Sequence, residues 1–145
     1  DLPAGSVLQV VSASTATEVT TTSGSMVDTG LTADITPSST ASKIMVIVTQ
    51  QVGAEDTSAY YALANFQTVR DASVIIESGP DYNFGHSRSG PADYLHYGYY
   101  AVSVLDTPAT IATITYKTQM ETHFGTAIAQ YAGARSTITL IEVAG

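Results

Sequence analysis

The sequence predicts an all-β protein: an antiparallel β-sandwich with a jelly-roll-like topology and about nine strands. Many segments alternate apolar and polar residues with a period of two, and turn residues separate them every 8–12 residues, a spacing typical of sandwiches. No stretch of ten residues has the 3.6-residue apolar spacing of a helix. Charged residues make up only 12% of the chain, and its many Thr, Val and Ile residues favour strands. Parallel strands would need helical crossovers, so the sheets should be antiparallel.

The amino-terminal part contains three expected strands. Residues 7–11 form a short apolar run, and the Thr-rich residues 17–22 are typical of an exposed edge strand. Residues 27–35 (VDTGLTADI) alternate strictly between apolar and polar side chains, which predicts a strand buried on one face. Pro37 follows and should end this strand.

Residues 43–52 (KIMVIVTQQV) predict a different kind of strand, because apolar side chains occupy both of its faces. Such a strand is expected to be covered on both sides. In an antiparallel sandwich the second cover is often a neighbouring subunit. Met45 and Ile47 lie on one of these two faces and are therefore candidate subunit-interface residues.

The remaining chain should form further strands around one long loop. Residues 78–93 contain several Gly and Pro with little periodicity, which predicts the longest loop of the molecule. Asp106-Thr107-Pro108 should form a corner between strands, with the side chain of Asp106 or Thr107 bonded to the backbone just ahead. The expected strands lie at residues 60–70, 72–77, 96–105, 111–119, 123–131 and 137–143.

Length and charge limit the possible functions. A chain of 145 residues is most simply a single domain covering residues 1–145. Its net charge of −8 and scattered Lys and Arg residues exclude nucleic acid as an expected partner. No apolar run approaches the length of a membrane span, so we expect no membrane insertion. The chain begins with Asp1 rather than Met, and we expect it to be the carboxy-terminal part of a longer protein.

The residues offer no clear catalytic site. Ser and His are adjacent in GHSRSG (residues 85–90), but the nucleophile-elbow pattern G-x-S-x-G is absent. The paired carboxylates Glu55 and Asp56 follow Gly53 and are typical of a solvated turn. We therefore expect no enzyme activity, no catalytic residues and no cofactor.

The three histidines do not have the spacing of a metal site. His86, His96 and His123 are far apart in sequence, whereas zinc sites usually contain at least one close pair of ligands. We expect no metal within one chain. Whether a His or carboxylate from each subunit binds an ion at a three-fold axis stays open at this point.

Tyrosines are concentrated in DYLHYGYY (residues 93–100). On a strand, Tyr97 and Tyr99 should point to one face, and His96 and Tyr100 to the other. Tyr buries a large area while keeping a polar tip. This cluster is thus consistent with cross-strand packing, with a subunit interface or with a platform for a glycan.

Several segments resemble a known family. LDTPAT at 105–110, TYKTQ at 115–119 and STITLIEVAG at 136–145 are similar to the carboxy-terminal domain of virion proteins from tailed bacteriophages, common in marine and cyanobacterial phages. LPAGSVLQVV at 2–11 and VDTGLTADITPSSTASKIMVIV at 27–48 are similar to the opening strands of the same family. The similarity covers most of the chain and is weakest across 53–93.

This resemblance implies a virion structural protein, located in the phage particle and assembled in the host cytoplasm. Family members look like compact jelly rolls that form trimers, similar in outline to tumour necrosis factor and C1q heads. An upstream segment would attach to other virion proteins, and this domain would form a tail-fibre or spike knob. Two alternatives stay open: a capsid decoration protein and, from another class, a carbohydrate-binding β-sandwich module.

These interpretations assign two sets of residues. Aromatic and Arg side chains dominate binding hot spots, so the candidate contacts to a host glycan or protein are Tyr82, Phe84, Arg88 and Tyr94. The candidate interface of the expected homotrimer consists of Met45, Ile47, Tyr97 and Tyr99.

Overall fold

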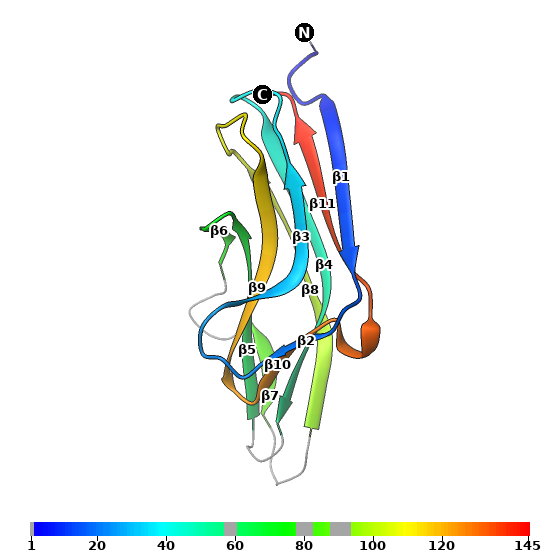
Figure 1. Ribbon diagram of the computed structural model, residues 1–145, viewed down its shortest axis with the longest axis vertical. Coiled ribbons are helices and arrows are strands. Elements are labelled where there is room, and N and C mark those ends of the chain that lie inside the picture. Colours follow the sequence, from blue (N-terminus) through cyan, green and yellow to red (C-terminus); the bar gives the residue numbers. More distant parts are fainter. Residues whose placement is uncertain (1, 57–60, 78–82, 88–93) are drawn as a thin grey trace.

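The chain folds into two antiparallel sheets packed face to face (Figure 1). This computed structural model describes residues 2–56, 61–77, 83–87 and 94–145, without the side chains of Ser87 and Tyr94. The described residues form eleven strands and one 3-10 turn, η1 (Tyr131–Gly133). The all-β prediction is therefore confirmed, and the strand number is higher than the nine expected.

The first sheet is built around one long strand. β4 pairs with β8 along its whole length; its other edge pairs first with β11 and then with β10. β1 extends the sheet beyond β11, and β2 extends it beyond β10. The bounds of these six strands are β1 (Val7–Thr15), β2 (Val19–Thr21), β4 (Lys43–Asp56), β8 (Tyr94–Asp106), β10 (Thr126–Ala129) and β11 (Ser136–Val143).

The second sheet has five strands. Its order is β3, β9, β5 and β6, and β7 also pairs with β5. In Figure 1 these strands form the layer that carries the labels β3, β9 and β5, in front of β4 and β8. Their bounds are β3 (Val27–Ile35), β5 (Tyr61–Arg70), β6 (Ser73–Ile76), β7 (Phe84–Ser87) and β9 (Ile114–Phe124).

Several sequence-based boundaries were wrong. Of the strand expected at 123–131, only Thr126–Ala129 forms β10, because β9 extends to Phe124 and η1 begins at Tyr131. The expected loop 78–93 contains β7, which the absence of periodicity concealed. Two features hold β7 beside β5: Asn83 bonds both the N–H and the carbonyl of Phe66, and Gly85 approaches Ala62 so closely that a Cβ would not fit. The strand expected from residue 111 begins instead at Ile114.

The hydrophobic core lies between the sheets and follows the alternation of the strands. In β3 every second residue from Thr29 to Ile35 is buried, as the strict alternation predicts. Burial removes roughly 25 cal/mol of unfavourable hydration per Å² of apolar surface, so these side chains hold the two layers together. The largest fully buried apolar side chains are Leu31, Ile44, Phe66, Tyr116, Met120, Ile138 and Leu140.

An ion pair joins the two sheets at one side of this core. Arg70 of β5 donates to both carboxylate oxygens of Asp106 in β8, at 2.9 and 2.7 Å. The hydroxyl of Tyr116 in β9 donates to the same carboxylate at 2.7 Å. Burial, and then the hydrogen bond to Asp106, raise the pKa of Tyr116 far above its ordinary value. Asp106 therefore contributes to the packing of the sandwich. This differs from the predicted role of its side chain as a cap of the following turn.

The two ends of the chain meet at the top of the sandwich in Figure 1. Gly5 donates its backbone N–H to Ala144 (2.8 Å), and Ala144 donates to Ser6 (2.9 Å). Close by, the buried carboxylate of Glu142 accepts hydrogen bonds from Gln9 and from the backbone and hydroxyl of Ser38, at 2.6–2.7 Å.

The environment of Glu142 changes its acidity. Burial raises its pKa, but the nearby Ser42 hydroxyl and the hydrogen bonds from Gln9 and Ser38 outweigh that effect and lower the pKa to about 2. The ionised carboxylate thus fastens the connection between β3 and β4 to β1 and β11.

Candidate interaction surface

The outer face of the first sheet carries an uninterrupted row of apolar side chains. Val10 of β1 lies opposite Ile141 of β11, Ile141 opposite Met45 of β4, and Met45 opposite Leu105 of β8. Ile47 follows Met45 on the same face and is 39% exposed. We call the outward side chains of these four strands the apolar face; its large members are Val10, Met45, Ile47, Tyr97, Tyr99, Leu105 and Ile141.

The centre of the apolar face has no charge. Lys43 and Glu55 mark the two ends of β4, and the outward residues between them are Met45, Ile47, Thr49, Gln51 and Gly53. The outward residues of β8 from Tyr97 to Leu105 are likewise uncharged. Each chain has a net charge of −8. Two copies could therefore bring these surfaces together without placing like charges in contact.

A shallow groove of about 240 Å³ runs across the apolar face between β4 and β8. It forms where the outward side chains become small, at Thr49, Ala101 and Ser103, beside Ile47. Tyr99, the next outward residue of β8 after Ala101, stands at one end of the groove, and Leu105 lies beyond Ser103 at the other.

Tyr97 and Tyr99 lie on the same face, as predicted. Their side chains are 63% and 66% exposed, whereas Tyr100 points inward and its hydroxyl lies 3.1 Å from that of Thr68. Tyr131 of η1 stacks on Tyr97, with ring centroids 6.1 Å apart. Gln51 lies opposite Tyr99, and its side-chain carbonyl accepts the backbone N–H of Tyr131 at 2.7 Å.

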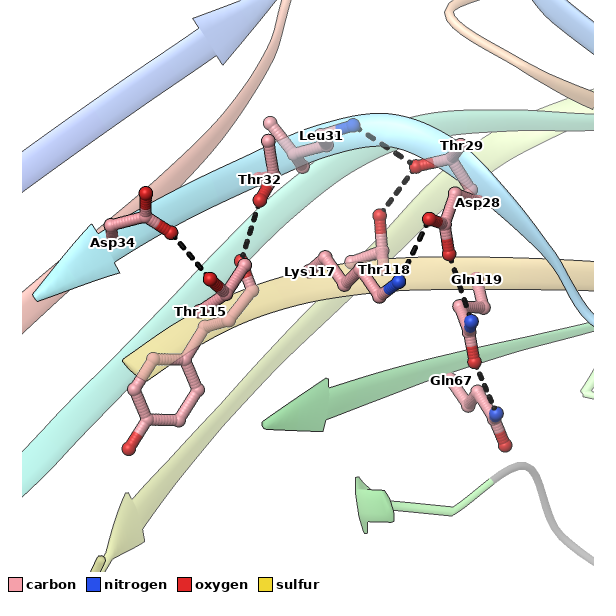
Figure 2. Close-up of polar contacts among 11 residues, drawn as sticks. Asp28, Thr29, Leu31, Thr32, Asp34, Gln67, Thr115, Lys117, Thr118 and Gln119 are labelled. Atoms are coloured by element: carbon pink, nitrogen blue, oxygen red, sulfur yellow. Dashed lines mark hydrogen bonds and ion pairs between the residues drawn. The ribbon is translucent and has the colours of Figure 1, made fainter. Parts of the chain in front are cut away.

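The outer face of the second sheet carries a network of hydrogen-bonded polar side chains (Figure 2). Asp28 of β3 accepts hydrogen bonds from Lys117 and Gln119 of β9, both at 2.8 Å, and Gln67 of β5 donates to Gln119 at 2.9 Å. One row away, Thr115 donates to Asp34 at 2.6 Å. We call the outward polar side chains of β3, β9 and β5 the polar face; β5 also carries the outward Tyr61, which is 37% exposed.

The prediction of a solvated turn at Glu55 and Asp56 was wrong, because both residues belong to β4. The carboxylate of Asp56 is buried, and His86 of β7 lies 2.9 Å from it. The ring of His96 is 6.1 Å from that of His86 between centroids. The sequence could not reveal this cluster, because β7 was taken as loop and its pairing places residues 30 positions apart side by side.

The histidine cluster does not amount to a metal centre. Within residues 2–56, 61–77, 83–87 and 94–145, no group of three or more His, Cys, Asp or Glu could hold a metal ion. An ion shared between subunits at a symmetry axis stays a separate question. The same described residues contain no helix that could span a membrane.

The predicted host-contact residues have different positions. Tyr82 and Arg88, and the side chain of Tyr94, lie outside the described residues. Phe84 begins β7; its ring packs edge-to-face on Phe66, with centroids 6.1 Å apart, and against His96 at 5.1 Å. Phe84 is therefore partly buried, and its role in binding a host stays a prediction.

Sequence reasoning missed three of the seven large side chains of the apolar face. It selected Met45, Ile47, Tyr97 and Tyr99, which the structure brings onto one surface. It did not include Val10, Leu105 or Ile141, because cross-strand register decides which outward residues adjoin. The alternation of residues in β1 and β11 already indicated which of their side chains point outward, but the strand order was needed to show that these side chains adjoin β4.

Comparisons with known proteins found similarity in fold alone. No protein-family model matches the chain, and no curated protein is significantly similar to it in sequence. Among solved structures, Eiger TNF from S. frugiperda has a TM-score of 0.50 at 12% identity, over 93% of each chain. That likeness confirms the sandwich with a tumour necrosis factor-like outline.

Two further structures come from infectious bursal disease virus. Its VP2 subviral particle has a TM-score of 0.45 at 13% identity, over 96% of this chain and 40% of the viral one. T=1 particles derived from the virus give 0.43 at 14% identity, over 97% and 37%. These values are too low to support a functional conclusion.

Proposed function

We propose that the chain is a structural module of a bacteriophage virion, a homotrimeric tail-fibre or spike knob that contacts the host surface. The phage assignment rests on the resemblance of the segments at 2–11, 27–48 and 105–145 described above. The proposed assembly rests on one observation. The chain has a net charge of −8, yet the centre of one sheet face carries a row of apolar side chains and no charged group.

The energetic argument favours self-assembly. Each exposed apolar side chain that a partner covers contributes through the hydrophobic effect. Contiguous apolar patches are uncommon on monomers and mark interaction sites. A neighbouring copy is the partner that a symmetric particle supplies in fixed stoichiometry, and most soluble homo-oligomers have closed point-group symmetry.

The proposal also places the host contact. Upstream virion segments would join near Leu2, where the two chain ends meet. The opposite end carries β7 and β10 and would face the host. Residues 78–93 are the proposed contact segment. We do not assign a catalytic reaction to the module, and we expect no cofactor.

Binding to cells and to capsids tests this function. The labelled chain should bind some members of a panel of cyanobacterial and other marine bacterial cells, and the double variant Tyr82→Ala/Arg88→Ala, which leaves β7 intact, should lose that binding. A Val74→Ala variant, altered on the second sheet, serves as the control. Binding to purified capsids but to no cells would replace the knob by a decoration protein, and unchanged cell binding by the double variant would remove the assigned contact residues.

A further inference from the structure

We propose that the groove between β4 and β8 holds the Tyr99 side chain of a second copy of this chain. The inference rests on the self-assembly proposed above and names the contact that specifies it. In a closed ring, Tyr99 of each copy would fill the groove of the next.

The size of the groove favours a side chain over a free ligand. Its volume of about 240 Å³ lies below the range of roughly 300–1,000 Å³ typical of small-molecule pockets. Its outward lining consists of Ile47, Thr49, Ala101 and Ser103 and includes no charged group. An apolar side chain with one polar tip suits such a surface, since the two hydroxyl groups can bond that tip.

Tyr99 has the properties of the missing occupant. It is 66% exposed, so in a single copy most of its surface stays in water. An aromatic side chain buries roughly 150–250 Å² when fully covered, and Tyr is enriched at the centre of interfaces for that reason. Tyr97, by comparison, already stacks on Tyr131 within its own chain.

The position of Tyr99 beside the groove makes the contact compatible with symmetry. It precedes Ala101 by two residues and lies on the same face of β8, so the donor side chain and the receiving groove are neighbours. Near a rotation axis, neighbouring patches of adjacent copies approach each other, and every copy can then give and receive the same contact. The uncharged surroundings allow this approach between chains that each carry −8.

Two substitutions test the contact from its two sides. Tyr99→Ala removes the occupant, and Ala101→Leu fills the groove. Each should raise the dissociation constant of the assembly at least about tenfold, because buried aromatic anchors dominate the binding free energy of interfaces. Tyr61→Ala, which removes an exposed tyrosine from β5 of the other sheet, should leave the dissociation constant unchanged.

The double variant shows whether the two substitutions disrupt the same contact or weaken assembly independently of each other. If Tyr99 occupies the groove, Tyr99→Ala and Ala101→Leu together should weaken assembly by clearly less than the product of their separate effects. Sedimentation equilibrium gives the dissociation constants, and circular dichroism checks that each variant is folded.

The outcomes distinguish this inference from the proposed function. An assembly that both single variants leave unchanged, or effects that multiply independently, would overturn the Tyr99 contact while the assembly proposal survives. A wild-type chain that is monomeric at every concentration would overturn both.

Discussion

The side chains on the two outer faces of the sandwich differ in whether they find their interaction partners within one chain. On the polar face, Asp28, Lys117, Gln119 and Gln67 form a ladder of hydrogen bonds within one chain. On the apolar face, Val10, Ile141, Met45 and Leu105 form a row across four strands, with no layer of the described chain above them. The first face is complete in a single copy, whereas the second gains free energy only when a partner covers it.

This difference is already present in the sequence. β3 alternates strictly, so its outward residues are Asp and Thr, which water and neighbouring side chains satisfy. The first half of β4 is apolar on both faces. One strand thus specifies a solvated surface and the other the proposed interface, although both contribute side chains to the core.

A charge placed on each face gives the largest expected contrast. Ile47→Glu should dissociate the proposed trimer, raising its dissociation constant at least about a hundredfold, because burying an unpaired carboxylate costs several kcal/mol. Val74→Glu places the same charge on β6 of the other sheet, at a similarly exposed position (47% against 39%). It should leave the mass measured by light scattering unchanged; equal effects of the two variants would abolish the distinction between the faces.

Loss of the ion pair between the sheets should lower the free energy of unfolding without acting on one outer face more than on the other. Asp106→Ala leaves Arg70 and the hydroxyl of Tyr116 without their acceptor. Arg70 and Asp106 are 24% and 13% exposed, so water compensates in part, and we expect a loss of about 2–4 kcal/mol.

Urea unfolding in the Ile47→Glu background measures this loss without a contribution from assembly. Tyr116→Phe keeps the ion pair and should cost about 1 kcal/mol. A loss below about 0.5 kcal/mol for Asp106→Ala would mean that the pair is replaced by solvent.

Glu142 predicts how stability depends on pH. Its pKa is lowered from 4.5 to about 2 in the folded chain, so the ionised form stabilises the fold. The contribution is complete above pH 4.5 and is lost as the pH falls towards 2; a shift of this size corresponds to at most about 3 kcal/mol.

The comparison with Glu142→Gln isolates that contribution. The difference in unfolding free energy between the wild type and this variant should shrink by about half or more between pH 7 and pH 3. A difference that is the same at both pH values would show that the loss comes from altered packing.

The smallest effect should come from the ladder of the polar face. Asp28 is 53% exposed and Lys117 27%. Burial raises the pKa of Asp28, but the hydrogen bonds from Lys117 and Gln119 outweigh it, so the net direction is down. Lys117→Ala should cost less than about 1 kcal/mol and still less in high salt. Chemical unfolding at two salt concentrations checks this, and a larger loss, independent of salt, would point to packing by the Lys117 stem.

The sequence was sufficient where local pattern decides the structure. The alternation at 27–35 located β3, and the double apolar pattern at 43–52 located the strand that carries the proposed interface. It was insufficient where distant residues meet. β7 has no periodic pattern and is held by Asn83 and Gly85, and Asp56 is buried beside His86, which lies 30 positions away in sequence. The groove exists only because β4 and β8 pair in one register, which places small residues side by side.

The most direct test of the apolar face as a subunit interface is the solution mass of the wild-type chain. Light scattering after size exclusion should give three times the chain mass of 15.1 kDa at micromolar concentration and remain at that value on dilution until the assembly dissociates. A mass of 15.1 kDa at every concentration would contradict the assignment, and the apolar face would then need a partner other than a second copy.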